Sequence, residues 1–155
     1  MSIRFVPMPE ETVAQLRAGG PDANGQPPER RIASEGGLPC RCCMADIAAG
    51  EAYLTLAYRP FPAPQPYAEV GPVFLHAEAC PRPKASAQLP AFLDSPSYIV
   101  RGYGEDDRIV YGTGAVVATD AIPQTAGRLL ADPGIAYLHV RSATNNCYHC
   151  RIERA

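Results

Sequence analysis

Cysteine and histidine residues occur in two short pairs that have the spacing of metal ligands. Cys40 and Cys43 form a C-x-x-C pair, and His76 and Cys80 form an H-x-x-x-C pair. A C-x-x-C turn lets two thiolates bind one tetrahedral ion, and thiolate and imidazole are ligands that Zn²⁺ prefers. Four protein ligands close such a site. The pattern therefore predicts a structural zinc with no catalytic open position.

Two other interpretations of the same residues stay open. Free cysteines are among the most buried residue types, so the set could be core thiols with His76 as a buried histidine. A redox role would need two of the thiols to pair with each other. The identity of the first ligand pair is also open, because Cys42 could replace Cys40 or Cys43.

A second C-x-x-C, Cys147 to Cys150, lies in a segment whose side chains alternate like those of a strand. Alternation points the two cysteines to opposite faces, so they would not converge on one ion. We expect Cys150 to be a buried core thiol.

The C-terminal region predicts a hairpin, in which residues 136–141 pair with residues 147–153. The loop Thr144-Asn145-Asn146 joins them, and asparagine adopts the left-handed conformation of such a turn at low cost. The same pattern gives the hairpin one apolar face and one polar face.

Four basic side chains share the predicted polar face of this hairpin: His139, Arg141, His149 and Arg151. In the expected register Arg141 lies opposite His149, and His139 lies opposite Arg151. Cations placed side by side repel each other unless an anion lies among them.

The positive charge of this face could be compensated by Glu153, by the acidic turn Asp106-Asp107, by a bound phosphate or carboxylate, or by solvent alone. Arginine binds such oxyanions with two parallel N–H donors. The face is therefore either a solvated strand surface or a site for a small anionic ligand. An enzyme acting on a small anionic substrate is the alternative function, with His139 or His149 moving protons and Arg141 holding the anion.

Length and composition exclude several classes of protein. The 155 residues fit one domain, and a formal net charge of -2 makes general nucleic-acid binding unlikely. No apolar run approaches the roughly 20 residues that cross a bilayer, and the N-terminal residues do not resemble a signal peptide. We expect a cytoplasmic protein with no membrane partner, and a single domain over residues 1–155 with a zinc-knuckle subregion at 38–82.

The elements that must position these residues are short. We expect a helix that begins at Pro9 and stops at Gly19-Gly20, and the 17 Pro and 13 Gly predict long loops and many turns. Further helices are expected at 89–93 and 122–130, and strands at 51–58, 70–76, 98–103 and 109–117. Strands that follow one another predict an α+β fold with a mainly antiparallel sheet, two or three short helices and long Pro/Gly-rich loops.

Several segments resemble an uncharacterised bacterial family, the domain-of-unknown-function family twelve-oh-three. They are Pro39-Cys40-Arg41-Cys42-Cys43, Gly50-Glu51, Tyr58-Arg59-Pro60-Phe61, residues 66–76, residues 139–143 and Cys150-Arg151-Ile152. The resemblance runs over nearly the whole chain and implies a stand-alone domain without an assigned activity. The family pattern, P-C-R-x-C with H-x-x-x-C, favours Cys40 and Cys43 over Cys42 as ligands. From the paired ligand spacing we predict a small binding or interaction module, of unknown partner, stabilised by a structural zinc.

Overall fold

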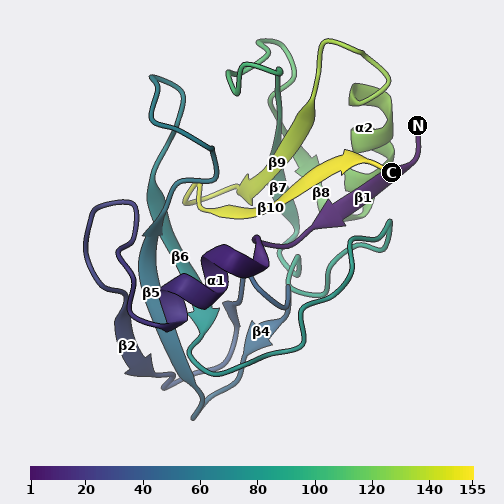
Figure 1. The fold of residues 1–155 in the computed structure, drawn as a ribbon. Helices are drawn as coiled ribbons and strands as arrows, with labels where there is room; N and C mark the ends of the chain where they lie inside the picture. The colour runs from purple at the N-terminus through teal and green to yellow at the C-terminus, as the bar shows by residue number, and fades with distance from the viewer.

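The structure is a computed structural model that describes residues 1–155, and it contains two α-helices and three β-sheets (Figure 1). The helical segments are α1 (Glu10–Arg17), the short 3-10 helix η1 (Thr119–Ala121) and α2 (Ile122–Leu129). The strands are β1 (Ile3–Val6), β2 (Glu29–Ile32), β3 (Leu38–Pro39), β4 (Asp46–Ile47), β5 (Ala52–Tyr58), β6 (Gly71–His76), β7 (Ser97–Tyr103), β8 (Ala115–Ala118), β9 (Tyr137–Ser142) and β10 (Tyr148–Arg154).

The largest sheet has five antiparallel strands in the order β1-β10-β9-β7-β8. One face of it packs against α2, which contributes Ile122 and Ala126 to a core that also holds Val100, Leu138 and Ile152. These three strand residues point to one face, as the two-residue period of a strand requires. The opposite face of this sheet carries His139 of β9, whose ring packs against Phe61 in the segment after β5.

A three-stranded sheet, in the order β2-β5-β6, carries a second core in the lower half of Figure 1. Val13 and Leu16 of α1 pack there with Leu54 and Leu56 of β5. Helix α1 starts after Pro9 with Glu10 in its first turn, as the sequence predicted, because proline and acidic residues suit a helix N-terminus.

Strand pairing brings the metal-ligand segments together. β5 and β6 are antiparallel, so that Tyr53 lies opposite His76 at the end of the pair. Cys40 forms a parallel bridge with Phe74, which places the C-x-x-C segment beside the same end of β6. The short β3–β4 pair, with Pro39 opposite Asp46, closes that segment into a turn.

The predicted α+β fold with a mainly antiparallel sheet is confirmed, and two of the expected elements need correction. Residues 89–93 form turns and no helix, although Phe92 and Leu93 are buried in the core. The strand expected at 109–117 is shorter, because Gly112 at φ 90° makes a turn and β8 starts at Ala115. No helix of this protein has the length and apolar character of a membrane span.

Candidate metal centre

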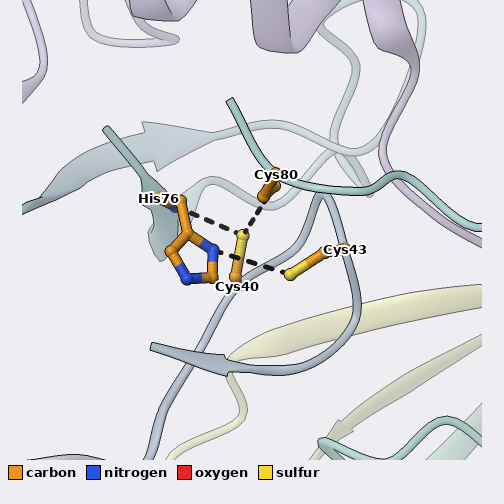
Figure 2. A group of neighbouring side chains, drawn as sticks. All are labelled: Cys40, Cys43, His76 and Cys80. Atoms are coloured by element: carbon orange, nitrogen blue, oxygen red, sulfur yellow. Dashed lines mark hydrogen bonds between the residues drawn. The ribbon is translucent and has the colours of Figure 1, made fainter. Parts of the chain in front are cut away.

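Four potential metal ligands converge beside the end of β6 (Figure 2). The sulfur atoms of Cys40, Cys43 and Cys80 and a ring nitrogen of His76 all lie within 4.8 Å of one another. Cys40 is buried and the other three residues are partly buried. The structure thus brings together the four residues that the sequence spacing selected.

The turn that carries Cys40 and Cys43 is fixed by its own backbone hydrogen bonds. The Cys40 N–H donates to the Ala45 carbonyl at 3.0 Å, and the Met44 N–H donates to the Cys40 carbonyl at 3.0 Å. Met44 adopts φ 56°, the left-handed conformation that closes such a turn. Both sulfur atoms are therefore presented from one rigid loop.

Two distances in the group match tetrahedral zinc. Ligand bonds of about 2.3 Å to sulfur and about 2.0 Å to nitrogen place two sulfur atoms roughly 3.8 Å apart, and sulfur and nitrogen roughly 3.5 Å apart. The Cys40 and Cys80 sulfur atoms are 4.0 Å apart, and the Cys43 sulfur is 3.5 Å from His76 Nδ1. Three thiolates and one imidazole are also a donor set that zinc prefers.

Neighbouring groups orient the ligands as they do in known metal sites. His76 Nε2 is 3.3 Å from the Glu51 carboxylate, so that a hydrogen on Nε2 leaves the Nδ1 lone pair free for a metal. The His76 backbone N–H donates to the Cys40 sulfur at 3.2 Å. Arg17 of α1 donates to the Cys80 sulfur at 3.0 Å and to the His76 carbonyl at 3.0 Å. Three thiolates around Zn²⁺ carry one net negative charge, which Arg17 would offset. Spacing within the sequence did not reveal Glu51 or Arg17.

Hydrogen bonds lower the pKa of the Cys40 thiol. The Cys43 thiol donates to it, and backbone N–H groups of Cys43, His76 and Cys42 assist, so that its pKa falls to about 4 although burial opposes the change. The same Cys40–Cys43 bond, together with burial, raises the pKa of Cys43. Without a metal, the thiolate of this pair therefore resides on Cys40.

Cys42 lies outside the group of four donors. It is buried in the core of the three-stranded sheet, and burial, with a hydrogen bond to Cys80, raises its pKa to about 12. Its place outside the donor group, among apolar side chains, makes Cys42 a core residue. Cys150 is also a buried thiol, as expected, and packs in the core of the five-stranded sheet.

The predicted C-terminal hairpin forms, but its register differs at one place. Arg151 lies opposite His139, as expected, whereas Arg141 lies opposite Tyr148 and not opposite His149. A β-bulge between Tyr148 and Cys150 inserts one extra residue into β10, which interrupts the side-chain alternation. His149 consequently packs against Phe92 and Tyr98 and away from the other basic residues.

The structure brings His139, Arg141 and Arg151 together. It also places Arg101 of β7 directly opposite His139 of β9 in the strand register. Carboxylates of the chain meet the arginines. Glu153 contacts Arg151 at 2.6 Å, one of the partners that the sequence suggested. Glu69 contacts Arg101 at 2.7 Å and Arg141 at 3.3 Å. Local sequence patterns do not reveal this contact, because it depends on how the β5–β6 loop folds. Asp107 instead accepts a hydrogen bond from Tyr137.

His139 is fully buried in an aromatic cluster. Its ring centroid lies 4.6 to 5.2 Å from those of Phe61, Tyr103, Tyr137 and Tyr148. Burial, and then the nearby arginines, lower its pKa well below the usual value, and burial lowers the pKa of His149 to about 4. Both histidines are therefore neutral at pH 7. His139, expected to move protons in the enzymatic alternative, has no exposed surface.

The neutral state of His139 predicts how stability depends on pH. In the unfolded chain a histidine binds its proton below about pH 6.5, whereas folded His139 does not, so the unfolded state takes up more protons there. The free energy of unfolding should therefore fall as the pH drops from about 7 to about 5, by up to roughly 1.4 kcal/mol per pH unit for this histidine. The charged groups that face His139 are Arg101, Arg141 and Arg151.

Urea denaturation of the wild-type protein and a His139→Phe variant across this pH range tests the prediction. Phenylalanine fits the aromatic cluster but has no proton to bind, so the variant should lose less stability in acid. The difference between the two curves isolates His139 from His76 and His149, which both proteins keep. Parallel curves would show that His139 is not the group responsible.

Comparison with known proteins places the chain in a family. A family model described as "Protein of unknown function (DUF1203)" matches residues 37–154, as the sequence resemblance indicated. No curated protein and no solved structure matches the chain. The matched residues include all four potential ligands and the C-terminal hairpin.

Proposed function

Because the chain belongs to the DUF1203 family, whose description assigns no activity, we propose a function from its geometry: a small binding module whose residues 38–82 are organised by one structural Zn²⁺. Cys40, Cys43, His76 and Cys80 would hold the ion, which would cross-link the segments that carry them. The observation that supports this proposal is the convergence of these four donor atoms within 4.8 Å.

The number and kind of ligands support a structural role for the ion. Catalytic zinc sites keep a coordination position for water or substrate, whereas four protein ligands fill the tetrahedron. The ion would join three segments: the turn after β3, the end of β6 and the chain at Cys80. Arg17 extends this connection to α1. Zinc would thus stabilise the core of the three-stranded sheet, and a binding partner would contact other surfaces of the protein.

Metal analysis of protein purified without chelator tests the proposal. We expect one zinc per chain by mass spectrometry of the metal. Chelation should lower the melting temperature by about 10 °C or more, since structural zinc contributes folding free energy directly. Cobalt in place of zinc should give the visible absorption of a tetrahedral thiolate site. Protein that contains no zinc, gains none on incubation with Zn²⁺ and melts unchanged in chelator would contradict the proposal.

Glu51 provides a second measurement at the same site. A Glu51→Gln variant keeps the size of the side chain but loses the carboxylate beside His76 Nε2, so its zinc affinity should fall by about tenfold to a hundredfold in a chelator competition. Glu78→Gln is the matched control, because Glu78 is an exposed carboxylate paired with Arg30 at 2.9 Å. Equal affinities of the Glu51 and Glu78 variants would exclude an orienting role for Glu51.

A further inference from the structure

Arg141 is a buried cation whose hydrogen bonds are only partly satisfied. Its side chain is 4% exposed, and its Nη1 lies 3.3 Å from Glu69 Oε2 and 3.2 Å from the Asn146 carbonyl. The Nε and Nη2 atoms are buried and have no partner. Buried donors almost always have acceptors, and these two atoms form the edge with which arginine binds an oxyanion in bidentate fashion. The arrangement lacks an acceptor on this edge.

The charges around Arg141 do not balance. Arg101 and Arg141 share a single carboxylate, that of Glu69, and Arg4 and Arg151 share that of Glu153. His139, which lies between the strands of Arg101 and Arg151, is neutral. These four arginines therefore outnumber the two carboxylates that pair with them, which leaves positive charge beside Arg141.

A small pocket adjoins Arg141. It has a volume of about 190 Å³ and is lined by Arg141, Glu69, Asn145, Asn146, Tyr58 and Tyr148, among others. Pockets for drug-sized ligands occupy roughly 300 to 1,000 Å³, so this one suits only a small group such as phosphate or a short carboxylate. The amide Nδ2 of Asn146 already donates to a carboxylate there, because it lies 3.3 Å from Glu69 Oε2.

We propose that this pocket binds a small oxyanion, a carboxylate or a phosphate, on Arg141 and Asn146, and that Glu69 is the internal anion with which the ligand competes. The contacts of Glu69 show the chemistry that the pocket recognises: one carboxylate oxygen meets a guanidinium and an amide together. The Glu69 side chain is 35% exposed, so it can turn toward solvent when another anion takes its place. The lining of the pocket includes none of the four potential metal ligands.

The test compares the melting temperature of the full-length protein in sodium phosphate, sodium acetate and sodium chloride at equal ionic strength. An anion that binds the folded state raises the melting temperature in a concentration-dependent way. We expect phosphate or acetate to do so and chloride not to. In a Glu69→Gln variant the half-saturating concentration should fall by about tenfold, because a like charge next to the ligand is removed. Without added oxyanion, the same variant should melt lower than the wild type.

Two further variants complete the experiment. Arg141→Lys keeps the charge but loses the planar pair of donors, so it should lose the anion-induced shift. Arg30→Gln removes an exposed arginine of the other sheet and should behave like the wild type. Binding of either anion by Glu69→Gln supports the site, and the more tightly bound anion identifies the ligand class. If Glu69→Gln folds and binds neither anion, or binds no more tightly than the wild type, the proposal is overturned.

Discussion

Replacement of Cys40 by serine is expected to abolish stoichiometric zinc binding and to lower the melting temperature at least as much as chelation of the wild type does, by about 10 °C or more. Cys40 lies in the centre of the donor group, with Cys80 at 4.0 Å and a backbone N–H of His76 directed at its sulfur. Structural zinc contributes an apparent free energy of about 10 to 16 kcal/mol in zinc-finger peptides, which equals or exceeds the roughly 5 to 15 kcal/mol of a typical domain. Loss of one thiolate should therefore remove a large part of the stability of the fold. Metal analysis and thermal melting by circular dichroism measure both effects.

The neighbouring cysteines supply the controls for this experiment. Cys42→Ala removes a buried thiol that is not among the four donors, so the variant should keep one zinc per chain and lose only packing energy, about 1 kcal/mol. Cys147→Ser changes a thiol in the hairpin loop and should leave both zinc content and melting unchanged. If Cys42→Ala loses zinc while Cys40→Ser retains it, Cys42 is the ligand and the assignment of the first pair is wrong.

Replacement of Arg41 by alanine is expected to lower the free energy of unfolding by about 3 to 5 kcal/mol. Arg41 is 2% exposed, and its guanidinium donates to the Tyr148 carbonyl at 2.8 Å and to the Pro39 carbonyl at 2.6 Å. Hydrogen bonds from a charged donor contribute about 1.5 to 3 kcal/mol each, and both carbonyls would lose this donor. Urea denaturation at pH 7 measures the loss.

Arg30→Ala is the control for the Arg41 variant. Arg30 forms an exposed ion pair with Glu78, and such pairs contribute about 0 to 1 kcal/mol. Arg41→Lys should recover only part of the lost stability, because an ammonium group cannot reproduce the two directions of the guanidinium donors. Arg41 would connect the C-x-x-C turn to the C-terminal hairpin through its bonds to the Pro39 and Tyr148 carbonyls. If Arg41→Ala unfolds at the same urea concentration as Arg30→Ala, this connection does not stabilise the fold.

The convergence of four potential metal ligands was predictable from the sequence, because their spacing is local and one chain reversal unites the two pairs. Cys40 and Cys43 share a turn, His76 and Cys80 share the end of a strand, and β5 and β6 bring these together by ordinary antiparallel pairing. Side-chain alternation also identified the apolar face of the hairpin at Leu138 and Ile152. Each of these inferences uses contacts between residues that are close in sequence or paired by one hairpin.

The remaining features depend on contacts that local patterns do not encode. Arg17 reaches Cys80 only because α1 packs on the second core, and Glu69 reaches Arg141 only because of the course of the β5–β6 loop. The expected pairing of Arg141 with His149 failed because strict alternation assumes a regular strand. A bulge shows no signature in composition when no glycine marks it.

The bulge in β10 determines where the hairpin can tolerate a change in chain length. A one-residue deletion inside a regular strand turns every following side chain to the opposite face of the sheet. Deletion of His149 would instead restore regular alternation, leaving Tyr148 and Arg151 on the face of His139 and Ile152 in the core. Deletion of Arg151 would turn Ile152 out of the core. His149 is thus a position of β10 at which a shorter homologue would keep the same two faces.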